Sequence, residues 1–251
     1  MRSLVASAAA VVCVAIVPAF GAAEVSDRVT RDVSAAAAAR IWIDATIAHV
    51  TLAGSNRTDA RVEIGRRAPG RADFDRFPAI VDERPDGLHV SVVQAGGGRD
   101  ARLNSTIRIE VPMDARIEAV RVAEGAVRLA RLRSACDVDL GRGAIEGADL
   151  AGRVRLESGL GSVDVRGAEL TPGGMMRLRV FNGPLRVQLA HPPANARILA
   201  LTFNGSLASD IPLAKKDRFG PRFGEATLGN GDPVLSMDVV KGDITLTVAK
   251  P

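Results

Sequence analysis

The sequence predicts an all-β chain that forms a single-stranded β-solenoid, similar to a right-handed β-helix, with coils of roughly 18–22 residues. The first observation is a recurring glycine, which separates successive copies by 18, 18, 22, 22 and 37 residues. The second is an alternating apolar and polar pattern on both sides of each glycine, which is typical of strands. The recurring glycines are Gly125, Gly143, Gly161, Gly183, Gly205 and Gly242.

The third observation is that apolar residues keep the same distance from the glycines in every copy. Two places after them stand Val127, Ile145, Val163, Leu185, Leu207 and Ile244. Three places before them stand Val122, Leu140, Val180, Thr202 and Val239, and Leu156 takes this place if 158–161 contain a two-residue insertion. Because side chains alternate across a strand, one copy cannot bury its apolar face alone. Stacking the copies buries all these faces in one column.

An antiparallel meander with a hairpin at each glycine is the alternative arrangement. A two-residue hairpin at Asn182-Gly183 would need a backbone N–H at position 184, where Pro184 has none. A solenoid corner does not need that hydrogen bond, since glycine reaches left-handed conformations freely. Lys241-Gly242 fits a hairpin well, but the Pro184 argument favours the solenoid.

The first 23 residues have the pattern of a secretory signal peptide. Arg2 precedes an apolar run from Leu4 to Val17, and small residues lead to a cleavage site after Ala23. The run is shorter than the roughly 20 residues that a membrane-spanning helix needs. We therefore expect an exported protein in the periplasm or at the cell surface, with no transmembrane segment after removal of residues 1–23.

The mature chain, 24–251, is expected to be one domain. Residues 33–40 predict a short helical turn, and strands at 41–43, 50–52, 60–64, 88–93 and 106–111 are interpreted as earlier coils of the same solenoid. Loop insertions are expected at 66–77, 94–100 and 215–232, the last of which explains the 37-residue interval and should project from the body.

The composition argues against several functions. Cys136 is the only cysteine after the leader, so no internal disulfide is expected. The formal net charge is +4, tyrosine is absent and aromatic residues make up 3% of the chain, which disfavours nucleic acid as a partner. His49, His89 and His191 lie far apart without metal-ligand spacing, and no nucleophile motif is present. We expect no metal, no cofactor and no catalytic residues.

The strand 107–111 that ends at Pro112 leads into Met113-Asp114-Ala115, and Gly161-Ser162-Val163-Asp164-Val165 is matched by Gly242-Asp243-Ile244-Thr245-Leu246. With the leader, these segments resemble the bacterial putative-adhesin domain family over roughly 40–250. The resemblance implies an exported β-solenoid of largely unknown function and supplies no catalytic residues. The chain departs from the family pattern in its 66–77 and 215–232 insertions.

Two groups of residues are candidates for ligand binding. Stacking should bring together a like-charged face formed by Arg153, Arg155, Arg177, Arg179 and Arg186, which could hold an anionic ligand or a glycan. The second group is a basic segment with aromatic residues that could contact a partner, formed by Lys215, Lys216, Arg218, Phe219, Arg222 and Phe223. The other outward columns carry mixed charges, as expected for cross-strand pairs on a solvated face.

The leading functional hypothesis is a non-catalytic, adhesin-like binding and scaffold protein of the cell envelope, whose partner is an envelope polymer, a glycan or an envelope protein. Two alternatives remain. One is a glycan-active enzyme of the β-helix type, which would usually need a longer chain and a deep groove between loops. The other is an envelope sensor or regulatory partner that acts through protein contacts.

Overall fold

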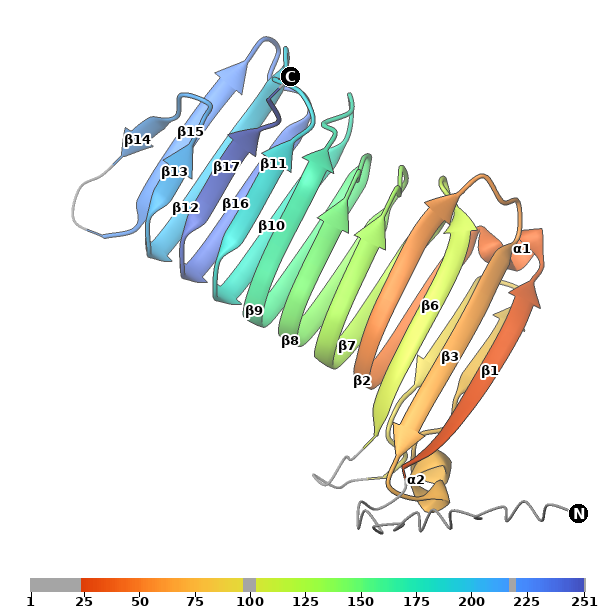
Figure 1. The fold of residues 1–251 in the computed structure, drawn as a ribbon. Coiled ribbons are helices and arrows are strands. Elements are labelled where there is room, and N and C mark those ends of the chain that lie inside the picture. The colour runs from red at the N-terminus through yellow and green to blue at the C-terminus, as the bar shows by residue number, and fades with distance from the viewer. Residues whose placement is uncertain (1–23, 97–102, 217–219, 251) are drawn as a thin grey trace, which may run out of the picture.

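The computed structural model describes residues 24–96, 103–216 and 220–250 of the 251-residue chain. The expected leader, 1–23, lies outside the described residues. Within them the protein is all-β, with seventeen strands in one open sheet and two short helices (Figure 1). The strands are β1 (Val25–Val33), β2 (Arg40–Ser55), β3 (Ala60–Ala68), β4 (Ile80–Arg84), β5 (Gly87–Val92), β6 (Asn104–Pro112), β7 (Arg116–Ala130), β8 (Cys136–Ala148), β9 (Arg153–Ala168), β10 (Met175–Asn182), β11 (Leu185–Leu189), β12 (Ala196–Asn204), β13 (Leu207–Ser209), β14 (Ala214–Lys216), β15 (Arg222–Leu228), β16 (Val234–Lys241) and β17 (Ile244–Val248), and the helices are α1 (Ala35–Ala38) and α2 (Arg71–Arg76).

The centre of the molecule is a ladder of long strands that pair in parallel. β7 pairs with β8 and β8 with β9, and the register aligns Gly125 with Gly143 and Gly143 with Gly161. Each of these strands continues through its glycine, so no hairpin forms there (Figure 1). The repeated pattern therefore marks laterally paired copies, as the sequence predicts.

The repeated glycine is required by close packing between neighbouring strands. Gly143 has a φ of 135°, and a Cβ built on it would lie 1.7 Å from the carbonyl oxygen of Gly125. Gly161 and Gly183 have the same relation to the preceding glycine, at 1.8 and 1.7 Å. Only glycine combines this backbone conformation with an unhindered approach of the next strand.

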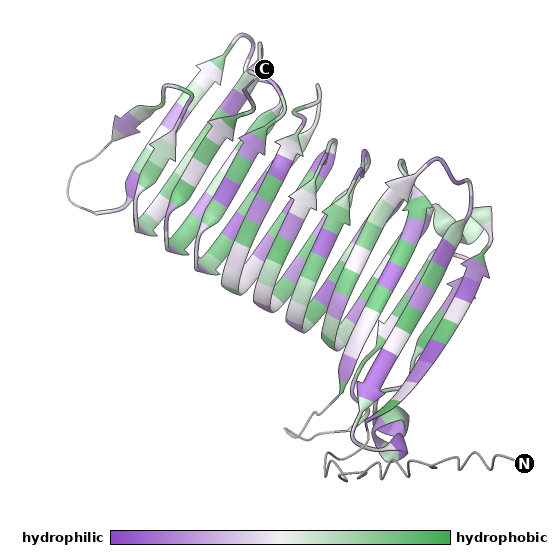
Figure 2. Ribbon diagram, in the orientation of Figure 1, coloured by the Kyte–Doolittle hydropathy of each residue, from purple (hydrophilic) through white to green (hydrophobic). Residues whose placement is uncertain are grey.

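The apolar columns form one continuous core. Residues such as Val138, Leu140 and Ile145 are fully buried between the strands. Figure 2 shows the corresponding alternation of hydrophobic and hydrophilic residues along each strand. No helix in the described part of the chain is long and apolar enough to cross a membrane.

The two-residue insertion expected in the third copy is wrong. Ser158 aligns directly with Leu140 on β8 and with Val180 on β10, and it is fully buried. Its hydroxyl donates a hydrogen bond of 3.4 Å to the carbonyl of Gly143. The serine is tolerated in an apolar column because this carbonyl satisfies its hydroxyl.

The stacking order departs from the chain order at both ends. β16 pairs with both β10 and β12, and β17 pairs with both β11 and β13, so the last copy lies between the fourth and fifth copies. At the other end, β2 lies between β7 on one side and β5 and β6 on the other. The 37-residue interval therefore joins the fifth copy to the last copy, which is inserted between the fourth copy and the fifth.

The early part of the mature chain differs from the expected series of coils. α1 confirms the helical turn at 33–40, and β2, β5 and β6 pair in parallel. However, β3 is antiparallel to β6, β1 is antiparallel to β3, and β4 is antiparallel to β5. These antiparallel strands cover the strand edges at this end of the stack, which would otherwise be open to pairing with other chains.

Two expected loops contain regular structure. In 66–77, β3 continues to Ala68 and α2 follows, while 94–100 lies partly outside the described residues. In 215–232, β15 pairs antiparallel with β12 and β14 pairs with β15. The expectation of a projecting loop is wrong for this part of the segment, because its residues extend the sheet beyond β12.

Candidate functional site

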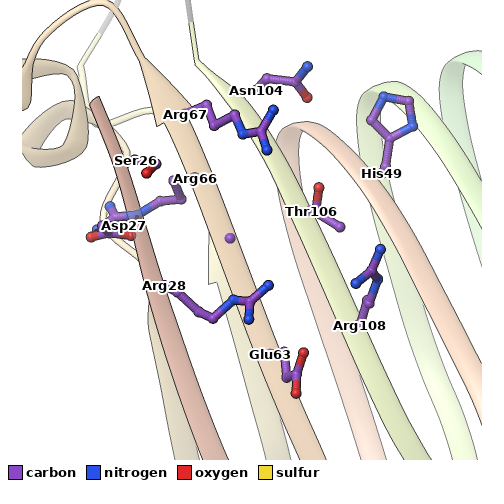
Figure 3. Close-up of a pocket in the computed structure, with 11 residues that line it drawn as sticks. Ser26, Asp27, Arg28, His49, Glu63, Arg66, Arg67, Asn104, Thr106 and Arg108 are labelled. Atoms are coloured by element: carbon purple, nitrogen blue, oxygen red, sulfur yellow. Dashed lines mark hydrogen bonds and ion pairs between the residues drawn. The ribbon is translucent and has the colours of Figure 1, made fainter. Parts of the chain in front are cut away.

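A hollow of about 630 Å³ lies on the outer face of β1, β3, β6 and β2. One row of paired residues crosses it, from Arg28 on β1 through Gly65 on β3 and Thr106 on β6 to His49 on β2. We call this hollow the arginine groove, and Figure 3 shows its lining.

Gly65 forms the floor of the arginine groove. It lies in the middle of β3, and no heavy atom would come within 4 Å of a Cβ built on it. Its φ is not in the left-handed region, so neither the backbone conformation nor a neighbouring atom requires glycine there. The missing side chain instead leaves an open space between the neighbouring strands.

Three arginines surround this floor (Figure 3). Arg28, Arg67 and Arg108 project from β1, β3 and β6 and are exposed. Among the described residues, none of the three forms an ion pair or a hydrogen bond through its side chain. Their guanidinium groups are therefore free to bind a ligand from solution.

The other lining residues are polar. Two carboxylates line the groove: Asp27, and Glu63, which is opposite Arg108 and whose Oε1 lies 3.5 Å from Nε of Arg61. Asn104, Thr106 and His49 add an amide, a hydroxyl and an imidazole. The lining therefore carries an excess of positive charge together with neutral hydrogen-bonding groups.

An ion pair between the buried Arg66 and the half-buried Asp27 holds together the strands β1 and β3 beside the groove. Arg66 is only 8% exposed, donates a hydrogen bond of 3.0 Å from Nε to Asp27 on β1, and contacts Asp27 again through Nη2. Its Nη1 donates to the carbonyl oxygen of Phe77 (2.6 Å), which caps the C-terminus of α2, and to that of Phe74 (3.0 Å) within α2. These bonds join β1, β3 and α2, so Arg28 and Arg67 project from a fixed backbone.

This arrangement is suited to binding. Guanidinium groups donate paired hydrogen bonds to carboxylate, sulfate or phosphate oxygens, and the amide and hydroxyl can bind sugar hydroxyls. In the described part of the chain, no group of three or more His, Cys, Asp or Glu residues is placed to hold a metal ion.

The structure brings together part of the predicted arginine face. Arg155 on β9 lies beside Arg177 on β10, and both line a hollow of about 310 Å³ with Arg153. Arg179 pairs with Glu157 and not with Arg155, because the third copy has no insertion. Arg186 lies on β11, on the other side of the corner, beside Asp164.

Carboxylates already occupy the guanidinium of Arg155. It donates hydrogen bonds of 2.7 Å to Asp137 and 2.7 Å to Glu157, and the bond to Asp137 raises its pKa. Arg179 lies 4.0 Å from Asp238. Arg153 and Arg177 are exposed and have no ion pair among the described residues.

The predicted partner segment is divided between two strands. Lys215 and Lys216 end β14, and Arg222 and Phe223 begin β15, where Lys216 is opposite Phe223. Phe223 is half-buried beside β12, whereas Arg222 is exposed. Arg218 and Phe219 lie outside the described residues.

Sequence reasoning missed the arginine groove. Gly65 carried a usable signal, since an isolated glycine within a strand can indicate close approach of another group. The sequence pattern places Arg67 in the predicted loop 66–77 and predicts no strand at 25–33. The contacts across β1, β3 and β6 depend on antiparallel pairing of distant segments, which no local pattern showed.

No protein-family model matches the chain, and no curated protein matches it. The structure is similar to that of a putative cell adhesion protein from Clostridium sporogenes, with 9% identity and a TM-score of 0.50 over 89% of this chain and 100% of the other. Putative adhesins from Bacteroides fragilis (14% identity, TM-score 0.48, 89% and 97% covered) and Parabacteroides merdae (11%, 0.40, 90% and 96%) also match. At these identities the likeness is one of fold, and at that level the resemblance to the bacterial putative-adhesin domains is confirmed.

Proposed function

We propose that the protein is an exported, non-catalytic, adhesin-like binding and scaffold protein of the cell envelope. Its mature part, 24–251, would be a single β-solenoid whose outer face holds an envelope polymer, a glycan or an envelope protein. The parallel, in-register strands and the fold similarity to the Clostridium sporogenes protein support this proposal.

The arginine groove is the observation that carries the proposal. Its three arginines have no partner among the described residues, and two of them, Arg28 and Arg67, project from strands that the Arg66–Asp27 ion pair joins. A rigid, exposed and positively charged hollow is a binding surface that needs no conformational change. A carboxylate pair with the geometry of a glycosidase would require two acids that both face the hollow, whereas of the two carboxylates that line the groove Asp27 is bound by Arg66 and Glu63 stands among arginines.

The test is to screen the mature protein on glycan and envelope-polymer arrays while assaying the same polymers for new reducing or unsaturated ends. Binding without turnover is the expected result. Turnover of any polymer would refute the non-catalytic assignment, and absence of binding to every polymer and envelope protein would refute the binding function.

Export is tested separately by expressing the full chain in a bacterial host. The expected product is a periplasmic or surface protein whose mass corresponds to cleavage after Ala23. A cytoplasmic product that retains residues 1–23 would contradict this part of the proposal.

The predicted arginine face and basic segment are proposed as additional contact surfaces. Arg153 and Arg177 offer free guanidinium groups, and Lys215 and Arg222 lie at the end of the stack. The double variant Arg155→Glu and Arg179→Glu should weaken ligand binding if this face contributes. Unchanged binding would show that the predicted arginine face does not contact the ligand, and would leave the proposal for the arginine groove intact.

A further inference from the structure

We infer that the arginine groove binds an acidic saccharide, that is, a segment of a glycan or sugar-phosphate polymer with carboxylate, sulfate or phosphate oxygens. This inference rests on the proposed binding function and names its ligand class. It depends on the charge of the groove, the spacing of its cations and the open floor at Gly65.

The charge of the groove selects an anion. Arg28, Arg67 and Arg108 have no ion-pair partner among the described residues, and Glu63 lies within reach of Arg61. Elsewhere on the outer face some arginines are neutralised by neighbours, as Arg128 is by Glu146 at 2.9 Å, whereas others, such as Arg142, have no ion pair among the described residues. The arginine groove therefore joins three free cations to the open space at Gly65.

The spacing of the cations favours an extended ligand over a single small anion. Arg28 and Arg108 lie on strands separated by β3, which places their backbones about 10 Å apart across the sheet. Arg67 is opposite Asn104, four residues before Arg108, so these two arginines are roughly 14 Å apart along the strands. One carboxylate would occupy only one or two of them, whereas an acidic oligosaccharide could contact all three.

The remaining lining groups match a sugar better than a nucleic acid. Asn104 and Thr106 offer an amide and a hydroxyl for hydrogen bonds to sugar hydroxyls. Among the described residues that line the groove, the His49 imidazole is the only ring, so bases would find little to stack on. The groove thus combines cations with neutral polar groups and lacks a stacking platform.

Gly65 provides a test that separates binding from folding. Because no atom lies near its Cβ position, Gly65→Ala, Gly65→Val and Gly65→Ile should fold as well as the wild type. Their side chains would fill the floor between the arginines progressively. Binding should therefore weaken in that order while thermal stability stays equal or rises.

The experiment measures affinity by calorimetry with a polyuronate, a sulfated glycan, a polyglycerol phosphate, neutral dextran and a single-stranded oligonucleotide. We expect binding to at least one acidic polymer and none to dextran. The three acidic probes distinguish carboxylate, sulfate and phosphate as the recognised group.

The triple variant Arg28→Gln, Arg67→Gln and Arg108→Gln should weaken binding by at least about tenfold, because each lost contact is a charge-assisted hydrogen bond. Its matched control replaces three exposed cations that have no ion pair among the described residues and lie outside the proposed contact surfaces, as Arg133→Gln, Arg142→Gln and Lys241→Gln. The control has the same net charge and should retain the wild-type affinity.

Three outcomes would overturn the inference. Wild-type affinity of Gly65→Ile and of the groove triple variant for the polymer would refute the groove while leaving the binding function intact. Greater loss in the control triple variant than in the groove triple variant would place the ligand outside the arginine groove. Preference for dextran or the oligonucleotide would refute the ligand class, and binding to no polymer or envelope protein would refute the proposed function itself.

Discussion

The recurring glycines make a quantitative prediction about the stability of the stack. Gly143 lies in the centre of the β7–β8–β9 ladder with a φ of 135°, and Gly143→Ala would place a Cβ 1.7 Å from the carbonyl oxygen of Gly125. An alanine in this backbone region costs about 1–3 kcal/mol. Separating the two strands to relieve the clash also weakens one or two ladder hydrogen bonds, each worth about 1 kcal/mol. The expected loss in the free energy of unfolding is about 2–5 kcal/mol.

Gly65→Ala is the matched control, because it makes the same chemical change in a strand without positive φ or a neighbouring atom. It should leave the free energy of unfolding unchanged or raise it by about 0.5–1 kcal/mol, since alanine loses less backbone entropy than glycine. Equilibrium urea unfolding followed by far-ultraviolet circular dichroism measures both variants, with the slope of the transition checked for constancy. Equal midpoints for Gly143→Ala and Gly65→Ala would refute the explanation of the repeated glycine.

Further predictions concern the remaining titratable groups. Burial raises the pKa of the Cys136 thiol to about 12, so the folded protein should resist thiol-specific reagents at pH 8 and react once unfolded; rapid labelling of the folded protein would contradict its burial. Hydrogen bonds from the Ser206 hydroxyl and backbone N–H, with Arg222 and Arg186 nearby, hold the pKa of Asp243 below its ordinary 3.8. Because the folded-state pKa is lowered, the ionised Asp243 stabilises the protein at pH values above 3.8, and this stabilisation is lost as the pH falls below that value. Asp243→Asn should therefore be less stable than the wild type at pH 7, and the difference should shrink as the pH falls below 3.8; a stability difference that does not depend on pH would exclude this linkage. Arg155→Gln should lower the free energy of unfolding by at most about 1 kcal/mol, measured by urea unfolding, because its ion pairs are exposed; a loss of several kcal/mol would mean that the pairs are effectively buried.

The parts of the fold that follow from local pattern were predictable from the sequence. The glycines identify the corners because close strand packing leaves room for no other residue, and the aliphatic columns identify the buried face. The position of β16 between β10 and β12 could not be read in this way. All copies have similar apolar columns, so the pattern does not specify which copy stacks on which.

The candidate site was not predictable for a related physical reason. β1 is an edge strand rich in exposed charged residues, and such strands lack the clear alternation that identifies a half-buried strand. Arg28 and Arg108 come together only through β3, which runs antiparallel to both neighbours. Ser158 illustrates the same limit in the core, where a backbone carbonyl made a polar residue acceptable in an apolar column.

The most direct test of a ligand site in the arginine groove is arginine-selective modification of the mature protein with phenylglyoxal, read by mass spectrometry with and without the best-binding acidic polymer. The groove assignment predicts that the polymer protects Arg28, Arg67 and Arg108, whereas Arg133 and Arg142 react at unchanged rates. Uniform protection of all exposed arginines, or protection confined to Arg153 and Arg177, would contradict it.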